Sequence, residues 1–154
     1  MSGLKPTPDQ MRTVPLAGCV VRPIRFVSVD APVDFVLAND VDVESVVADL
    51  AGYKSIALVF PKWVDGRAYS QARLLRERHG YDGELRATGQ VLRDQFVFML
   101  RAGFDAFEVK KDADADAFAE TVKRYSVFYQ PTGDSRVAAF NRRMQLRHSE
   151  SAGR

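Results

Sequence analysis

Apolar and polar positions alternate along residues 33–130 in blocks that predict strands and helices in turn. The block Ser55–Phe60 is almost entirely apolar, which is typical of a strand buried on both faces of a parallel sheet. Other short apolar runs predict strands at 33–38, 84–87 and 106–109. A further strand is predicted at 24–29, and a closing strand at 126–129.

Between these runs, apolar residues recur at helical spacing. Val43, Val46, Val47 and Leu50 form one apolar helix face, with Asp40 or Asp42 placed to cap it. The other helices are predicted at 67–79, 92–102 and 114–124. In the helix at 67–79, Ala68, Ala72 and Leu75 share one face, whereas Arg73, Arg76 and Arg78 fall mostly off it. In the helix at 92–102, Leu92, Phe96 and Met99 are aligned.

A glycine followed by an aromatic residue marks the end of three predicted elements. These pairs are Gly52-Tyr53, Gly80-Tyr81 and Gly103-Phe104. Glycine reaches the left-handed conformation that often ends a helix, and the aromatic ring then folds back on the last turn. The spacing predicts an α/β fold of about four βα units with a parallel sheet. Both half of a (β/α)-barrel and an open, flavodoxin-like doubly wound sheet fit this pattern.

The two ends of the chain differ in composition from the middle. Residues 1–32 hold five of the seven prolines, so they are predicted to form an irregular N-terminal arm. Residues 33–130 are predicted to form a single α/β domain. Residues 131–154 carry several arginines around apolar positions at helical spacing, which predicts a basic C-terminal helix or a disordered tail.

Composition excludes several classes of protein. The chain has 154 residues, of which 46% are apolar, enough for one domain with a full core. With one cysteine and two histidines, a single chain cannot build a Cys/His zinc site or a four-cysteine iron–sulfur site. No nucleotide or flavin fingerprint is present, so no cofactor or metal is predicted. The net charge of +2 does not point to nucleic acid, and the absence of a long apolar run predicts a cytoplasmic protein without a membrane partner.

Candidate chemistry gathers in the loops that follow two central strands. Residues 61–67 and 88–95 each lead into a helix, and parallel sheets bind ligands at the carboxyl ends of their strands. Arg67 and Arg93 lie in first helical turns, where a cation is unfavourable unless an anion joins it. With Arg86 expected to point to the same place and Gln95 nearby, these four residues are the predicted anion-binding set.

A structural reading of the same residues stays open. Asp65 and Asp94 are placed to pair with the neighbouring arginines, and further loop or structural positions are Trp63, Gly66, Tyr69, Gly89 and Gly103. For catalysis, Asp94 and Glu108 are the two candidate carboxylates, because both are expected near strand ends. These residues do not indicate a particular reaction, and they leave open whether the chain is an enzyme.

Several longer motifs resemble an uncharacterised bacterial family, the domain of unknown function 934. The resemblance covers about residues 33–130. It rests on the runs 60–70, 72–78, 83–89, 92–95 and 103–108. The matching positions include Asp65, Gly66, Arg67, Tyr69, Ser70, Arg73, Arg86, Gly89, Arg93, Asp94, Gln95, Gly103, Asp105 and Glu108. Gln90 and Ala68 depart from the pattern, since Asp and Gly are common there; Gln90 cannot carry a proton as an Asp would.

The resemblance implies a pathway rather than a reaction. Members of this family are typically encoded beside assimilatory sulfite reductase and adenylyl-sulfate reductase. Sulfite reduction needs a cofactor that delivers six electrons, and this chain carries no residues for one. We therefore expect an accessory protein that binds sulfate, sulfite or a sulfonucleotide, or that docks on sulfite reductase.

Two alternatives from other classes stay beside this expectation. One is an enzyme that acts on a small phosphorylated or sulfated substrate, and the other is a purely structural interaction subunit. Open strand edges also predict a homodimer.

Overall fold

The computed structural model describes residues 24–50, 52–109, 112–124, 128–129 and 139, and its centre is a parallel sheet of five strands. The strands are β1 (Arg25–Val27), β2 (Phe35–Leu37), β3 (Ser55–Phe60), β4 (Glu84–Gly89) and β5 (Ala106–Glu108). Their order across the sheet is β1-β5-β4-β3-β2. The predicted α/β fold with a parallel sheet is thus confirmed. The strand prediction at 126–129 falls partly outside the described residues, and Phe128 there pairs with Ala139 instead of joining this sheet.

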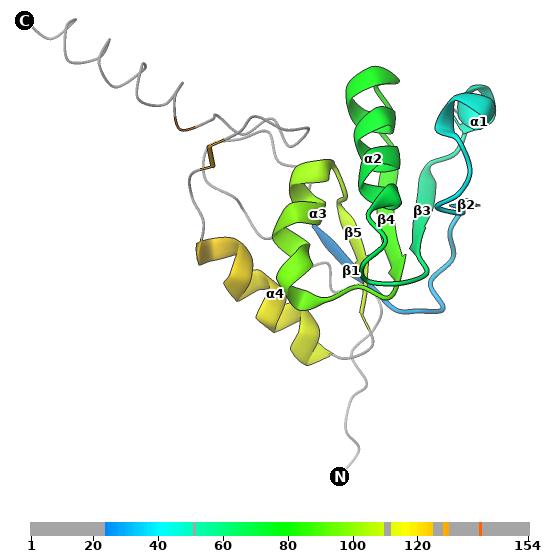
Figure 1. The fold of residues 1–154 in the computed structure, drawn as a ribbon. Coiled ribbons are helices and arrows are strands. Elements are labelled where there is room, and N and C mark those ends of the chain that lie inside the picture. Colours follow the sequence, from blue (N-terminus) through cyan, green and yellow to red (C-terminus); the bar gives the residue numbers. More distant parts are fainter. Residues whose placement is uncertain (1–23, 51, 110–111, 125–127, 130–138, 140–154) are drawn as a thin grey trace, which may run out of the picture.

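The order of the strands decides which face of the sheet the helices cover. Strands β2, β3, β4 and β5 follow one another in one direction, as they would in half of a (β/α)-barrel, and not in flavodoxin order. Right-handed connections therefore place all the intervening helices on one face, as Figure 1 shows. The step from β1 to β2 runs back across the whole sheet, so its connecting segment, residues 28–34, crosses the opposite face.

Four βα units are present, as the hydrophobic pattern predicts. The helices are α1 (Val43–Leu50), α2 (Arg67–Arg73), α3 (Phe96–Ala102) and α4 (Asp112–Arg124). Two of them have irregular extensions, because α2 continues into a π-helical turn, η1 (Leu74–Arg78), and a 3-10 turn, η2 (Arg93–Gln95), precedes α3. Among the described residues, none of these helices is long and apolar enough to cross a membrane.

The core lies between the sheet and this single layer of helices. Alternate residues of the central strands, such as Ile56, Leu58 and Phe60 of β3, point into it and are almost completely buried. Phe107 of β5 and Phe118 of α4 lie with ring centroids 4.8 Å apart, which fastens α4 to the sheet. Leu92, in contrast, stays 40% exposed. The prediction that Leu92 is aligned with Phe96 and Met99 in one helix is wrong, because Leu92 has an extended backbone and precedes the 3-10 turn.

Two of the glycine–aromatic pairs end helical segments, as predicted. Gly103 is left-handed with φ 110°, and the Phe104 amide donates to the Met99 carbonyl, closing the last turn of α3. Gly80 adopts φ 61° after η1, and Tyr81 packs into the core. Gly52 differs, because it is not among the glycines with positive φ. Helix α1 thus ends without the left-handed turn that we expected there.

The π-helical turn η1 moves one arginine into the interior. The His79 amide donates to the Leu74 carbonyl, five residues back, and this wider turn rotates Arg76 toward the core. The Arg76 side chain is only 6% exposed, and it pairs with Asp105 at 2.9 Å. It also donates to the backbone carbonyls of Gly103, Tyr81 and Gly83. The prediction that Arg76 lies off the buried face of its helix is therefore wrong.

Candidate functional site

A pocket opens at the carboxyl ends of β4 and β5, where the pattern predicts a ligand site. We call it the edge pocket. It has a volume of about 670 Å³, and its lining residues are Trp63, Gly89, Gln90, Val91, Leu92, Arg93, Asp94, Phe96, Glu108 and Val109. The volume falls in the ordinary range for small-molecule sites, roughly 300–1,000 Å³. Of the predicted site residues, Trp63, Gly89, Arg93, Asp94 and Glu108 are brought together here.

Adjacent parallel strands bring the charged side chains of the pocket together. Arg93 and Asp94 begin the turn that follows β4, and Glu108 is the last residue of β5, the next strand in the sheet. Among the residues that the structure describes, the charged lining is one cation and two carboxylates. Such a lining offers both donors to an anionic group and acceptors to hydroxyl or amino groups of a ligand. It would repel a bare multivalent anion at its acidic part.

The wall toward β3 is formed by the loop 61–66. The Gln95 side-chain amide donates to the Trp63 carbonyl at 2.8 Å, which ties this loop to the turn after β4. The indole of Trp63 is 52% exposed, so a flat aromatic surface lies at the pocket rim. Gln95 thus holds the loop in place through its amide nitrogen and is not itself a lining residue of the pocket.

Gly89 brings the two neighbouring strand ends close together. It has φ 92°, and a Cβ added to it would lie 2.5 Å from the Phe60 carbonyl oxygen. The Gln90 amide donates to the same oxygen at 2.8 Å, which holds the ends of β3 and β4 together at the pocket. Glycine is therefore required here for both its conformation and its lack of a side chain.

Arg67 is held by Asp65 in a corner next to the pocket. Its Nε and NH2 atoms donate to the two carboxylate oxygens of Asp65 at 3.0 and 2.7 Å. Asp65 also accepts a longer hydrogen bond from the Arg67 amide. This is the structural ion pair that the sequence left open as an alternative. Arg67 is not among the residues that line the edge pocket, although its guanidinium remains 59% exposed.

This corner gives a testable dependence of stability on pH. Hydrogen bonds from Arg67 hold the pKa of the Asp65 carboxyl well below its usual value of 3.8. A carboxylate with a lowered folded-state pKa stabilises the fold above the unfolded-state pKa, and this contribution is lost as the pH falls through the folded-state value. We therefore expect the difference in melting temperature between the wild type and Asp65→Asn to be constant from pH 5 to 7. It should shrink below pH 4 in thermal melts. A difference that stays unchanged at pH 3 would contradict this account.

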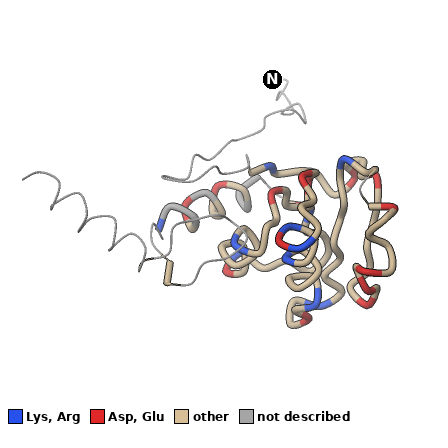
Figure 2. The backbone as a smooth tube through the Cα atoms, turned by 90° about the horizontal axis from the view of Figure 1, so that it is seen from above, with Lys and Arg blue, Asp and Glu red and all other residues tan. Residues whose placement is uncertain are grey.

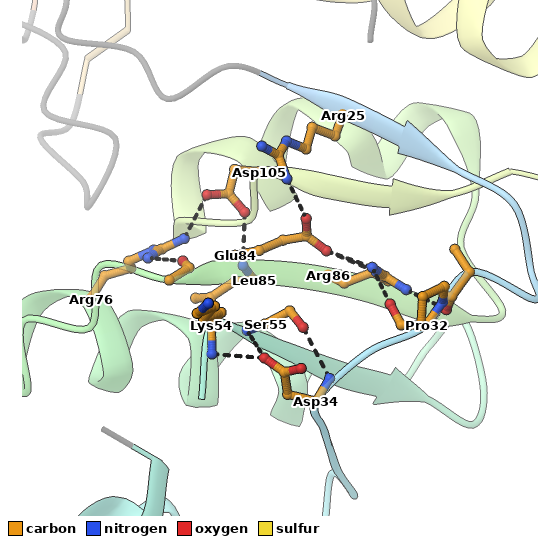
Figure 3. Close-up of polar contacts among 12 residues, drawn as sticks. Arg25, Pro32, Asp34, Lys54, Ser55, Arg76, Glu84, Leu85, Arg86 and Asp105 are labelled. Atoms are coloured by element: carbon orange, nitrogen blue, oxygen red, sulfur yellow. Dashed lines mark hydrogen bonds and ion pairs between the residues drawn. The ribbon is translucent and has the colours of Figure 1, made fainter. Parts of the chain in front are cut away.

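Arg86 does not join Arg93 at the carboxyl edge. Its side chain projects from β4 onto the face opposite the helices, where it is 6% exposed (Figure 3). There it donates to the carbonyls of Ala31 and Pro32, and to Glu84, which also accepts from Arg25. Arg86 therefore clamps the segment that crosses from β1 to β2. The expectation that Arg86 points to the anion site is corrected by this geometry.

Tyr69 lies inside α2 and lacks the properties of a proton-transfer group. Its ring packs edge-on against Phe60, with centroids 5.3 Å apart. Burial, and next the charge of Asp94, raise the pKa of Tyr69 to about 12, so the phenol stays neutral at ordinary pH. This supports a structural role for Tyr69. Gly66 precedes α2, and Gly103 ends α3 away from the pocket.

The structure also identifies polar residues that the sequence pattern did not single out. Gln71 of α2 is buried, and its amide nitrogen donates to the carbonyls of Ala38 and Val41, which fixes the loop after β2. Asn39 in that loop is also buried and contributes to the lowered pKa of Asp65. The signal available in the sequence was a single glutamine on an otherwise apolar helix face. From the sequence alone, a glutamine at such a position is expected to face solvent.

Charge is distributed unevenly along the sheet. Between Phe26 and Tyr53 there are six Asp or Glu residues and no Lys or Arg. Figure 2 shows acidic positions, in red, at the end of the domain where β2 and α1 lie. An anionic ligand is therefore disfavoured at the β2 end. Among the described residues, no group of three or more His, Cys, Asp or Glu side chains is placed to hold a metal ion.

Comparison with known proteins adds a family but no characterised relative. A family model described as "Bacterial protein of unknown function (DUF934)" matches residues 34–140, which include every lining residue of the edge pocket. No curated protein and no solved structure matches the chain.

Proposed function

Because the chain belongs to the DUF934 family of bacterial proteins, we propose that it is an accessory binding protein of assimilatory sulfate and sulfite reduction. Its edge pocket would bind a small ligand with an anionic group, such as sulfate, sulfite or a sulfonucleotide. The pathway in this proposal comes from the gene neighbourhood that the family resemblance implies. The binding site comes from the pocket.

The ligand-binding part of this proposal depends on one observation, which is that Arg93 lines the edge pocket. A guanidinium in a pocket of this kind binds oxyanions through two parallel hydrogen bonds. Arg67 is held by two hydrogen bonds to Asp65 and is not among the residues that line the pocket. Arg86 is omitted from the proposed site because its donors serve Glu84 and the crossing segment.

Titration calorimetry with sulfate and sulfite tests the anion site. We expect Arg93→Gln to weaken binding by about 1.5–3 kcal/mol, the usual contribution of a hydrogen bond to a charged group. Arg67→Gln, which removes an arginine from the neighbouring corner, should change binding by less than about 1 kcal/mol. Equal heats in the wild type and the Arg93 variant would contradict the site.

A second candidate is an enzyme that acts on a small phosphorylated or sulfated substrate. The observation in its favour is that Asp94 and Glu108 line the same pocket as Arg93. A carboxylate within hydrogen-bond reach of a water molecule or hydroxyl group of the bound substrate would serve as a general base. Asp94→Asn and Glu108→Gln variants that bind ligand but no longer release product would favour this candidate over a binding protein.

A further inference from the structure

The edge pocket is much larger than an inorganic oxyanion requires. Its volume of about 670 Å³ corresponds to roughly 20 water molecules at about 30 Å³ each. The pocket wall runs from Trp63 after β3, through Arg93 after β4, to Glu108 at the end of β5. Three adjacent strand ends span roughly 10 Å. The space therefore fits a ligand with several distinct parts.

The charges of the lining argue in the same direction. Among the described lining residues, Asp94 and Glu108 accompany Arg93, so an anionic group bound at Arg93 would have carboxylates as neighbours. A ligand that also carries hydroxyl or amino groups would turn both carboxylates into hydrogen-bond acceptors. A ligand that carries both an anionic group and donor groups would therefore match all three of these side chains.

The third part of the ligand is indicated by Trp63. Its indole is 52% exposed at the rim of the pocket, and it is the only tryptophan of the chain. An exposed indole offers a flat surface on which a nucleobase stacks, at a gain of about 1–3 kcal/mol per base. Leu92, 40% exposed, adds apolar surface to the same pocket.

We infer that the edge pocket binds a nucleotide, with the base on Trp63, the anionic group at Arg93, and hydroxyl or amino groups at Asp94 and Glu108. This inference rests on the proposed function, because it uses the same anion site, and it narrows the ligand class. A bare oxyanion then occupies only the Arg93 end of the pocket.

Adenosine 5′-monophosphate is the probe, with ribose 5-phosphate, adenosine and sulfate as comparisons. Titration of the full chain, followed by the fluorescence of Trp63 and by calorimetry, should show the nucleotide binding at least about tenfold more tightly than each comparison. Because Trp63 is the only tryptophan, quenching by the nucleotide and not by ribose 5-phosphate reports the base at this wall.

Substitutions at Trp63 and Arg93 test the binding of the base and of the anionic group separately. Trp63→Leu should weaken nucleotide binding about tenfold in calorimetry and leave ribose 5-phosphate within twofold. Phe98→Leu is the matched control, because Phe98 is 67% exposed on α3 but does not line the pocket. It should change neither affinity. Arg93→Gln should weaken the nucleotide, ribose 5-phosphate and sulfate alike.

The outcomes also distinguish this inference from the proposed function. If sulfate or ribose 5-phosphate binds through Arg93 and the nucleotide binds no more tightly, the nucleotide inference is overturned and the anion site stands. If Trp63→Leu leaves nucleotide binding unchanged, the inference is likewise overturned. If no anionic ligand depends on Arg93, both proposals fall.

Discussion

Replacement of Arg76 by methionine is expected to lower the free energy of unfolding by about 3–5 kcal/mol. The substitution keeps an apolar stem of similar length but removes the guanidinium that pairs with the largely buried Asp105 carboxylate. It also leaves the carbonyls of Gly103, Tyr81 and Gly83 without the donors that Arg76 supplies. A buried acceptor that loses its partner costs the full desolvation penalty. Denaturant titration followed by circular dichroism measures the change.

Arg73→Met is the matched control for this experiment. Arg73 lies one turn earlier in α2, and it forms an exposed pair with Glu77 four residues on. Exposed pairs of this kind contribute about 0.3–0.5 kcal/mol. We expect Arg73→Met to change the free energy of unfolding by less than about 1 kcal/mol. Similar losses in both variants would mean that Arg76 is not the buried anchor described above.

Gly89→Ala is expected to cost roughly 2–4 kcal/mol and to disturb ligand binding as well. The new Cβ would lie 2.5 Å from the Phe60 carbonyl oxygen, which is backbone and cannot turn away. The residue would also have to keep φ near 92°, a conformation that L-residues with side chains rarely adopt. Strain of this kind and overpacking each cost about 1–3 kcal/mol. Thermal or denaturant unfolding measures the loss.

Gly52→Ala serves as the comparison. Gly52 does not have positive φ, and the nearest atom to its added Cβ, the Asp49 carbonyl oxygen, would be at 3.7 Å, an ordinary contact. We expect Gly52→Ala to be neutral or to stabilise the protein by up to about 1 kcal/mol. A loss at Gly52 as large as that at Gly89 would contradict the steric explanation.

Most of the fold follows from local pattern, because strands and helix ends are set by nearby residues. Strand β3 is observed with the predicted bounds Ser55–Phe60. The choice between an open doubly wound sheet and a barrel-like order depends on where β1 pairs. That pairing joins Arg25 to Ala106 and leaves no local trace in the sequence.

The candidate site was predictable where it depends on topology and not where it depends on side-chain direction. Arg93 and Glu108 come together because neighbouring parallel strands end at one edge of the sheet. The prediction for Arg86 was wrong because successive side chains of a strand point to opposite faces of the sheet. The Arg86 side chain points to the face that the β1–β2 segment crosses. Arg76 was missed because a π-helical turn breaks the 3.6-residue period used to assign helix faces.

The position of β1 also bears on how the chain assembles. Pairing β3 with β4 joins Ser55 to Glu84 across 29 positions, whereas pairing β1 with β5 joins Arg25 to Ala106 across 81. Closing the longer loop costs about 1 kcal/mol more in chain entropy. The βα units from β2 to β5 can therefore form from contacts close in sequence, and β1 docks on a sheet that already exists. Strand β1 would then be the last of the five strands to enter the folded domain.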